Sequence, residues 1–428
     1  MAVCLCGILP DTQVVTSDPS PTPPEERILG LDVLRGFALL GILIINIRVF
    51  AMPFTTLNNP TVYASATPYG EFAGVNYLVW LVGHIAAERK FITLFTVMFG
   101  AGIILFTQGK DASEVLRLHY RRTGFLLVAG LAHAYLLWYG DILVPYALCG
   151  LVVVFVRDWE AKQLARTGLV LVAVPSLLYI MSGLSPGSTQ AVAAQWAPAE
   201  ARLLAEVETY RSGWLAQLDH RVPTAFAQQT SGFISVVFWR TSGLMLAGMA
   251  LFKWGVLTNE RSTTFYRRLL AGGLLGGLGV TLAGVWYTET VDWAAREALF
   301  FGTQFNYWGS LLLAGAYIAG VMLLCRRFGG GVVTTALSAV GRTAFSNYLL
   351  QTLIATSIFY GHGLGLFGSV TRIEQAGIVV VIWTGQIILS VLWLRYVRFG
   401  PAEWLWRAVT YGRRPPLRKD RSTDAAGD

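Results

Sequence analysis

The stretch from Val33 to Ala51 decides the fold class, and it reads VLRGFALLGILIINIRVFA. A run of about 20 mostly apolar residues is long enough to cross a bilayer as a helix. Lipid offers the backbone no hydrogen-bonding partner, so a run of this kind must be helical. We therefore predict an all-α, polytopic transmembrane bundle of about ten spanning helices. The predicted spans are 33–51, 90–108, 123–140, 142–157, 165–183, 233–252, 268–287, 306–325, 335–360 and 375–397.

The composition also indicates a membrane protein. Of the 428 residues, 54% are hydrophobic and only 14% are charged, whereas soluble domains carry about 25% charged residues. The net charge of +8 could indicate a nucleic-acid partner, but the basic residues concentrate in alternate loops and in the C-terminal tail. That pattern is typical of the positive-inside bias. We expect no nucleic-acid partner, a multi-pass protein in the plasma membrane, and both termini in the cytoplasm.

We expect one transmembrane domain, 27–412, between two cytoplasmic tails. Residues 1–26 are Pro-rich and predict disorder, and 413–428 form a basic and then polar tail. One external helix is predicted at about 198–221, where it lies on the bilayer, caps a cavity or only connects its neighbours. A short apolar helix at 76–87 extends the second span, lies at the interface or re-enters the membrane. The four cysteines predict no disulfide framework.

The most informative polar residues are His133 and Asp141. His133 lies within an apolar span, roughly 15 Å from its start at 1.5 Å per residue, and histidine exchanges protons near neutral pH. Asp141 follows in a tight turn. Eight residues separate the two side chains, about 80° around an ideal helix, so contact requires the helix to end or bend. We predict that both are catalytic; the alternative is a hydrogen-bonded bundle histidine and a turn aspartate.

Other polar groups in or beside the spans are candidate substrate-binding residues, because such groups are costly to hold in a membrane. Asp32 and Arg35 are three residues apart and could pair on one helix face. Structural alternatives are a helix-start ion pair, a snorkelling lysine and interhelical hydrogen bonds. We expect no metal site. The candidates are Asp32, Arg35, Asn46, Lys90, Trp138, Tyr146, Arg342, Ser346, Asn347 and Gln351.

Several ordered stretches resemble the YeiB-like bacterial membrane family, which carries a domain of unknown function. They are RILGLDVLRGFALLGILIIN (Arg27 to Asn46), KFITLFTVMFGAG (Lys90 to Gly102), GLAHAYLLWYGDILVPYAL (Gly130 to Leu148), GRTAFSNYLLQ (Gly341 to Gln351) and GPAEWLWRAVTYGRRPPLR (Gly400 to Arg418). The family is distantly similar to the transmembrane acyltransferase superfamily, which moves acyl groups from cytoplasmic acyl-CoA to acceptors. Descriptions of the family also favour transport.

The first functional hypothesis is an integral-membrane acyltransferase. His133 would act as general base or nucleophile toward a hydroxyl or amine on a small molecule or glycan, and Asp141 would orient the imidazole or bind the acceptor. Acyl-CoA would be a co-substrate, with no tightly bound cofactor. Arginines would meet its phosphates. Those predicted to do so are Arg121, Arg122, Arg326 and Arg327, with Arg342 from the ninth span.

Two other hypotheses stay open. A small-solute transporter would use Asp32, Arg35, His133 and Asp141 as ion or proton relays. A non-catalytic lipid-binding or assembly protein would tolerate neutralisation of His133 and Asp141. The lipid bilayer is the expected partner in all three hypotheses, and the sequence leaves the oligomeric state open, a homo-oligomer included.

Overall fold

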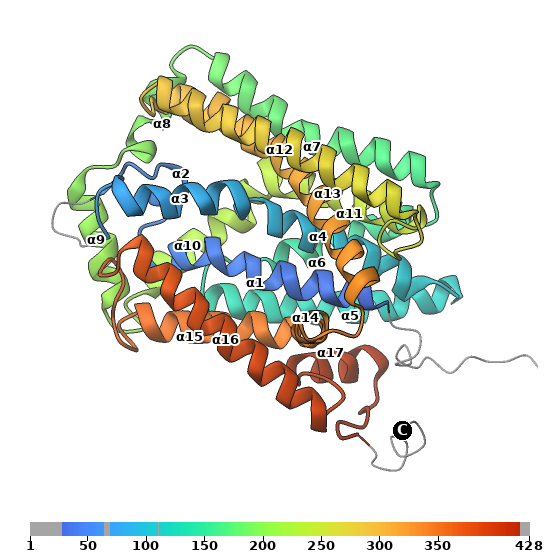
Figure 1. Cartoon of the computed structure of the whole chain (residues 1–428). Helices are drawn as coiled ribbons and strands as arrows, with labels where there is room; N and C mark the ends of the chain where they lie inside the picture. Colours follow the sequence, from blue (N-terminus) through green and yellow to red (C-terminus); the bar gives the residue numbers. More distant parts are fainter. Residues whose placement is uncertain (1–27, 64–68, 110, 420–428) are drawn as a thin grey trace, which may run out of the picture.

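The computed structural model describes residues 28–63, 69–109 and 111–419, and every regular element in them is helical (Figure 1). The predicted tail at 1–26 and the end of the predicted tail at 413–428 lie outside these residues. The helices, including three π-helices and one 3₁₀ helix labelled η, are α1 (Leu29–Ala51), α2 (Thr55–Asn58), α3 (Gly74–Ala86), α4 (Lys90–Thr107), α5 (Ala112–Ala132), η2 (His133–Leu137), α6 (Leu143–Val153), η3 (Val154–Val156), α7 (Ala161–Leu184), α8 (Ser188–Trp196), α9 (Glu200–Arg211), α10 (Leu218–Gln229), η4 (Phe233–Val237), α11 (Phe238–Lys253), α12 (Thr263–Thr290), η5 (Glu297–Gly302), α13 (Thr303–Phe328), α14 (Val332–Arg342), α15 (Ala344–Phe359), α16 (Arg372–Tyr396) and α17 (Pro401–Tyr411).

Within the described residues, seven helical stretches are long and apolar enough to cross a membrane, so the chain is a membrane-spanning helical bundle. They are Leu29–Ala51, Gly74–Thr107, Ala161–Leu184, Leu218–Lys253, Thr263–Thr290, Glu297–Phe328 and Arg372–Tyr396. The other three predicted spans, 123–140, 142–157 and 335–360, fall on shorter or more polar helices. The apolar helix Leu143–Val156, for example, covers only about 21 Å.

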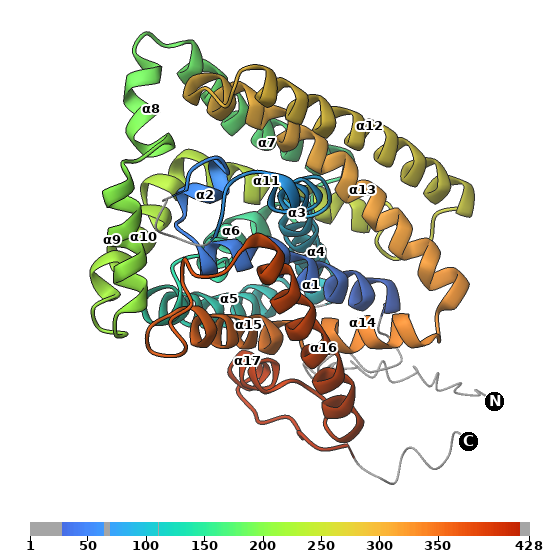
Figure 2. The ribbon, with the colours of Figure 1, turned by 60° about the vertical axis from the view of Figure 1, so that its left-hand side comes forward.

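Burial separates a central helix from peripheral ones. In the most apolar 18-residue stretch of α1, 72% of the residues are buried, against 28% in the corresponding stretches of α7, α12 and α16. Figures 1 and 2 place α1 in the middle of the bundle and these three helices at its edges. An outer helix that stays apolar on its exposed face is typical of contact with lipid.

The structure corrects the predicted span 335–360, which is two helices with a break at Thr343. Helix α14 packs directly on the backbone of α1. A Cβ atom on Gly341 would lie 1.9 Å from the Asp32 carbonyl oxygen, and one on Gly36 would lie 1.9 Å from the Leu337 carbonyl oxygen. The two glycines therefore fix the start of α15 beside the start of α1.

The predicted external helix at about 198–221 is also two helices, α9 and α10, separated by residues 212–217. They lie at the end of the bundle opposite the start of α1 and opposite α17, and we call it the cap end; the other end, where the described part of the chain begins and ends, is the termini end (Figure 2). Trp214 Nε1 donates to the Leu136 carbonyl oxygen at 2.7 Å, and Arg221 Nε donates to the Tyr135 carbonyl oxygen at 2.9 Å. These bonds satisfy two carbonyl groups at the end of η2. Because the helix ends there, these groups have no N–H partner within it.

The short helix predicted at 76–87 is α3, and it extends the second span. A three-residue turn joins α3 to α4, with Arg89 in the left-handed region at φ 65°. The two helices follow each other along one direction (Figure 1). This span is therefore a broken helix, and the break falls in its interior.

Candidate active site

His133 and Asp141 are in direct contact. Helix α5 widens into the π-helix η2 at His133 and ends at Leu137, and Trp138 is extended. The chain then turns back, so that Asp141 Oδ1 lies 2.9 Å from His133 Nδ1. Asp141 Oδ2 accepts the Val144 N–H at 2.7 Å, which anchors the carboxylate at the start of α6. Both side chains are only 1% exposed.

The structure adds a third residue, Thr352 of α15, which the sequence pattern does not indicate. Its hydroxyl oxygen lies 2.9 Å from His133 Nε2, and Thr352 is 1% exposed. A carboxylate at Nδ1 keeps the N–H on that nitrogen and leaves the Nε2 lone pair to accept the Thr352 O–H. The order of carboxylate, imidazole and hydroxyl is that of a base-activated nucleophile. A single threonine in an apolar helix carries no sequence signal that would mark it as a site residue.

A cavity of about 300 Å³ opens between the helix ends at the termini end of the bundle. Its charged lining comes from α1, α5, α14, α17 and the segment before α17. The charged residues in its wall are Asp32, Arg35, Arg122, Arg342, Arg398, Glu403 and Arg407. Five arginines against two carboxylates make the cavity basic. Arg35 and Asp32 pair at 3.0 Å, as their spacing predicted.

The rest of the wall is mostly apolar and aromatic, and at its inner end it reaches Ile142, Tyr146 and Tyr348. The Tyr348 ring lies 5.0 Å from the His133 ring, and its hydroxyl accepts the Ile142 N–H at 3.3 Å. His133 does not line the cavity. Tyr348 therefore separates the basic cavity from the buried His133–Asp141 pair by one side chain.

Helix α17 covers part of the cavity and is held by contacts with α5 and α15. The Arg122 guanidinium lies 4.7 Å from the Trp406 ring, whose Nε1 donates to the Arg122 carbonyl oxygen. The Glu403 carboxylate accepts the backbone N–H groups of Phe345 and Ser346 and the Ser346 hydroxyl. It thus caps α15, where a negative charge is favoured. Burial nevertheless raises the pKa of the Glu403 carboxyl above its ordinary value, because it exceeds the opposing effect of these hydrogen bonds.

The structure brings together only part of the predicted substrate-binding set. Asn347 Nδ2 donates to Ser390 Oγ at 2.8 Å, and Gln351 Nε2 donates to Gln386 Oε1 at 2.9 Å, so both join α15 to α16. These are the interhelical hydrogen bonds expected under the structural alternative to substrate binding. Asn46 is half-buried in α1, outside the cavity wall.

Three more of the predicted residues lie at separate places in the bundle. Trp138 stacks on Phe50 with ring centroids 4.0 Å apart. The Tyr146 hydroxyl, at the inner end of the cavity, lies 2.6 Å from Thr96 Oγ1. Lys90 lies at the α3–α4 break, apart from the cavity wall.

Of the arginines predicted to bind acyl-CoA, Arg122 and Arg342 line the cavity, but Arg121, Arg326 and Arg327 do not. Arg326 instead donates to Asn259 Oδ1 at 2.8 Å, in the loop between α11 and α12. Arg398 and Arg407, which were not among the predicted arginines, also line the cavity. Both belong to the basic C-terminal region and flank the start of α17, but only the docking of α17 shows where they lie.

Comparison with known proteins gives matches along nearly the whole chain. Residues 251–413 match the family described as Protein of unknown function (DUF418). The "Uncharacterized protein YeiB" of Escherichia coli (strain K12) is 34% identical over 390 residues, covering 90% of this chain and 96% of the relative. The "Uncharacterized protein YxaH" of Bacillus subtilis (strain 168) is 31% identical over 418 residues, covering 93% and 98%. The resemblance predicted from sequence is confirmed, and this chain belongs to the YeiB-like DUF418 family.

Proposed function

We propose that this protein is a membrane acyltransferase that takes an acyl group from acyl-CoA in the basic cavity. The observation that supports this proposal is the course of the cavity, from an arginine-rich mouth to an apolar inner end next to the His133–Asp141 pair. Arginines suit phosphate groups, and an apolar inner end suits an acyl chain. The proposal makes the termini end cytoplasmic and places the protein in the bacterial plasma membrane.

In the proposed reaction, His133 Nε2 takes the proton of an acceptor hydroxyl or amine as the acceptor attacks the thioester carbonyl. The carbon–sulfur bond breaks, the proton passes to the CoA thiolate, and the products are the acylated acceptor and free CoA. Asp141 holds the imidazole and stabilises its positive charge. Tyr348 must move aside for the thioester to reach His133, and the acceptor displaces the Thr352 hydroxyl from Nε2.

The first test is binding of acetyl-CoA to the full-length protein in nanodiscs. We expect Arg342→Gln to weaken binding by about tenfold or more, the value of roughly one charge-assisted hydrogen bond. Arg327→Gln is the matched control. Arg327 lies in the last turn of α13, at the termini end of the bundle, but outside the cavity wall. Equal binding by wild type, Arg342→Gln and Arg327→Gln would exclude the cavity as the acyl-CoA site.

The second test measures acyl transfer in proteoliposomes given acetyl-CoA outside and a sugar inside, with release of free CoA thiol as the readout. We expect His133→Gln to bind acetyl-CoA like wild type but to release no thiol above background. Thiol release at the wild-type rate by this variant would refute the role of His133.

A small-solute transporter is the second candidate, and the broken α3–α4 span supports it. Transporters place substrate and ion sites where spanning helices are interrupted near the middle of the membrane. Here the interruption carries Lys90, Arg89 and Glu88. This function predicts uptake of a labelled solute by proteoliposomes in the absence of acyl-CoA.

A further inference from the structure

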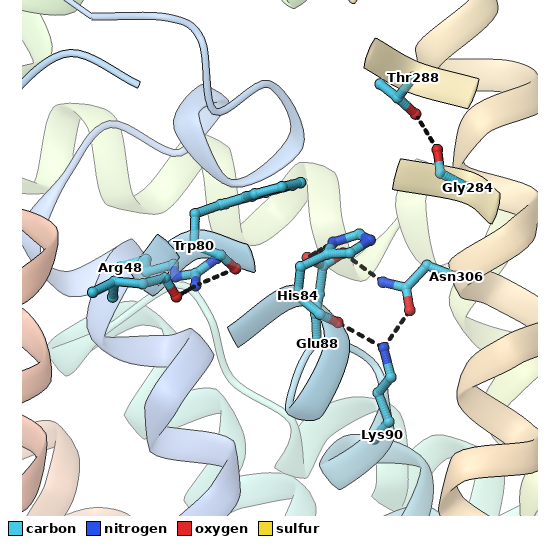
Figure 3. A network of polar contacts seen from close by, with 9 residues as sticks. Arg48, Trp80, His84, Glu88, Lys90, Gly284, Thr288 and Asn306 are labelled. Carbon is cyan, nitrogen blue, oxygen red and sulfur yellow. Dashed lines mark hydrogen bonds and ion pairs between the residues drawn. The ribbon is translucent and has the colours of Figure 1, made fainter. Parts of the chain in front are cut away.

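A second polar cluster, in which Lys90 and Asn306 are buried and His84 and Glu88 are partly exposed, surrounds the α3–α4 break (Figure 3). None of these residues lines the cavity. Lys90 is 0% exposed, and its Nζ atom donates to the His84 carbonyl oxygen at 2.7 Å and to Asn306 Oδ1. The Asn306 amide nitrogen donates to Glu88 Oε1 at 3.2 Å, and Glu88 Oε2 lies 2.8 Å from His84 Nδ1. Asn306 thus bridges one ammonium and one carboxylate, which balance each other.

Two further cations in the cluster have no such balance. Arg89 and Arg240 place their guanidinium carbons 5.7 and 5.0 Å from the centre of one ring, that of Tyr307. Arg240 Nη2 donates to neutral hydroxyls, Thr93 Oγ1 at 3.0 Å and Ser310 Oγ at 3.4 Å. Its Nε is buried without a hydrogen-bond partner, and within the described residues neither arginine forms an ion pair.

Three backbone irregularities lie close to this cluster in the sequence. Arg89 is in the left-handed region at the α3–α4 break. The π-helix η4 leads directly into α11, which carries Arg240, and the π-helix η5 leads directly into α13, which carries Asn306. π-Helices and interrupted spans are often found at functional sites. The polar residues of the cluster therefore come from three segments, each of which contains or follows an irregular helical turn.

The charge of the cluster indicates what it would bind. Arg89, Lys90 and Arg240 outnumber Glu88, and the break lies roughly 20 Å along the span from the start of α3. Uncompensated charge at this depth is costly, and a bound counter-charge offsets that cost. The open donors belong to guanidinium groups, which match oxygen anions in geometry.

We propose that Arg89 and Arg240, both beside the ring of Tyr307, bind an oxyanion: the phosphate of an anionic lipid, whose headgroup carries no cation of its own, or a free phosphate or carboxylate. This site goes beyond the proposed acyl transfer and does not depend on it. It is separate from the arginine-lined cavity, since none of these three residues lines that cavity.

The test uses the full-length protein in phosphatidylcholine nanodiscs without acyl-CoA, and it follows thermal unfolding by tryptophan fluorescence. One arm adds inorganic phosphate or acetate in exchange for chloride at constant ionic strength. The other arm replaces part of the phosphatidylcholine by phosphatidylglycerol. We expect the midpoint Tm to rise by about 2–5 °C in one arm, since a ligand of the folded state stabilises it. A rise with free anions identifies a soluble ligand, and a rise only with phosphatidylglycerol identifies a lipid.

The variants Arg89→Gln and Arg240→Gln should lose this rise, whereas Arg202→Gln, an exposed arginine of α9, should keep it. Without added anions, the glutamine variants should unfold at no lower temperature than wild type, because they remove uncompensated charge. A purely structural role predicts the opposite, a lower Tm in every condition. The proposal is overturned if no anion raises the wild-type Tm, if Arg89→Gln and Arg240→Gln keep the full rise, or if both variants are destabilised without anions.

Discussion

Asp141 follows His133 by eight residues, yet its Oδ1 atom lies 2.9 Å from the imidazole Nδ1 atom. A regular helix would keep these side chains apart. The contact exists because α5 ends as a π-helix and the chain turns back into α6. The same turn gives Asp141 Oδ2 the Val144 N–H, so one carboxylate both starts α6 and orients the histidine.

This relationship predicts the effect of Asp141→Asn. Asparagine keeps an oxygen for the Val144 N–H but removes the negative charge beside the imidazole. We expect the rate of acyl transfer, kcat, to fall by about 10²–10⁴-fold, the usual contribution of a positioned base. The KM for acyl-CoA should stay within about twofold, since Asp141 lies outside the cavity wall. An unchanged kcat in Asp141→Asn would contradict the catalytic role of the pair.

Tyr348 should control access from the cavity to His133. Replacing it by alanine removes the ring that lies 5.0 Å from the imidazole. We expect His133 in Tyr348→Ala to react with diethyl pyrocarbonate at least about tenfold faster than in wild type. Mass spectrometry of the modified peptide measures this rate. His119, buried in α5, the helix that leads into η2, and bonded to the Gly150 carbonyl oxygen, is the internal control and should keep its wild-type rate.

Tyr348→Phe separates this barrier from the hydrogen bond to the Ile142 N–H. Phenylalanine keeps the ring but removes the hydroxyl, which costs about 1–3 kcal/mol if the N–H is left unsatisfied. His133 should therefore stay as unreactive as in wild type, while the protein unfolds at a lower temperature. Equal reactivity of His133 in all three proteins would show that Tyr348 does not separate the two sites.

The sequence predicts the architecture of the bundle well because apolar length is a local property. The runs around α1, α7, α12 and α16 are long enough to identify each helix without knowledge of its neighbours. The break at Thr343 could not be predicted in this way. Beside this break, Gly341 lies close to the Asp32 carbonyl oxygen, and such proximity between residues far apart in the chain leaves no local pattern in the sequence.

The candidate site was predictable only in part, for the same reason. His133 and Asp141 are unusual residues at unusual places, so the sequence alone singles them out. Thr352 is an ordinary residue in an apolar helix, and it becomes notable only because α15 places its hydroxyl 2.9 Å from His133 Nε2. In the sequence, Arg326 and Arg407 look alike, since each is a basic residue next to apolar ones. Arg407 lines the cavity and Arg326 does not, and only the docking of α17 shows this difference.

The contact between α1 and α14 predicts a large effect of Gly341→Ala. The added Cβ atom would lie 1.9 Å from the Asp32 carbonyl oxygen, so the two backbones would have to move apart. Overpacking of this kind costs about 1–3 kcal/mol or more, and it would also shift Arg342 within the cavity wall. Gly272→Ala in α12 is the matched control, because nothing lies within 4 Å of its Cβ position.

We expect Gly341→Ala to unfold at a lower temperature than wild type and to bind acetyl-CoA more weakly, with both properties measured in nanodiscs. Gly272→Ala should match wild type in both. If Gly341→Ala were as stable as its control, then α14 would not pack on α1 as closely as described.

Glu403 predicts a specific pH dependence of stability. Burial raises the pKa of its carboxyl above the ordinary value of 4.5, so the folded state holds this proton more tightly than the unfolded state. The stabilisation from this proton is complete below pH 4.5 and is lost as the pH rises through the raised pKa. Glutamine at this position cannot titrate but keeps an oxygen for the Phe345 and Ser346 N–H groups. Thermal unfolding of Glu403→Gln should therefore depend less on pH than that of wild type above pH 4.5. Glu208→Gln, a change at an exposed residue of α9, should keep the wild-type profile. Identical slopes in wild type and Glu403→Gln would show that the folded protein does not hold the Glu403 proton more tightly than the unfolded chain does.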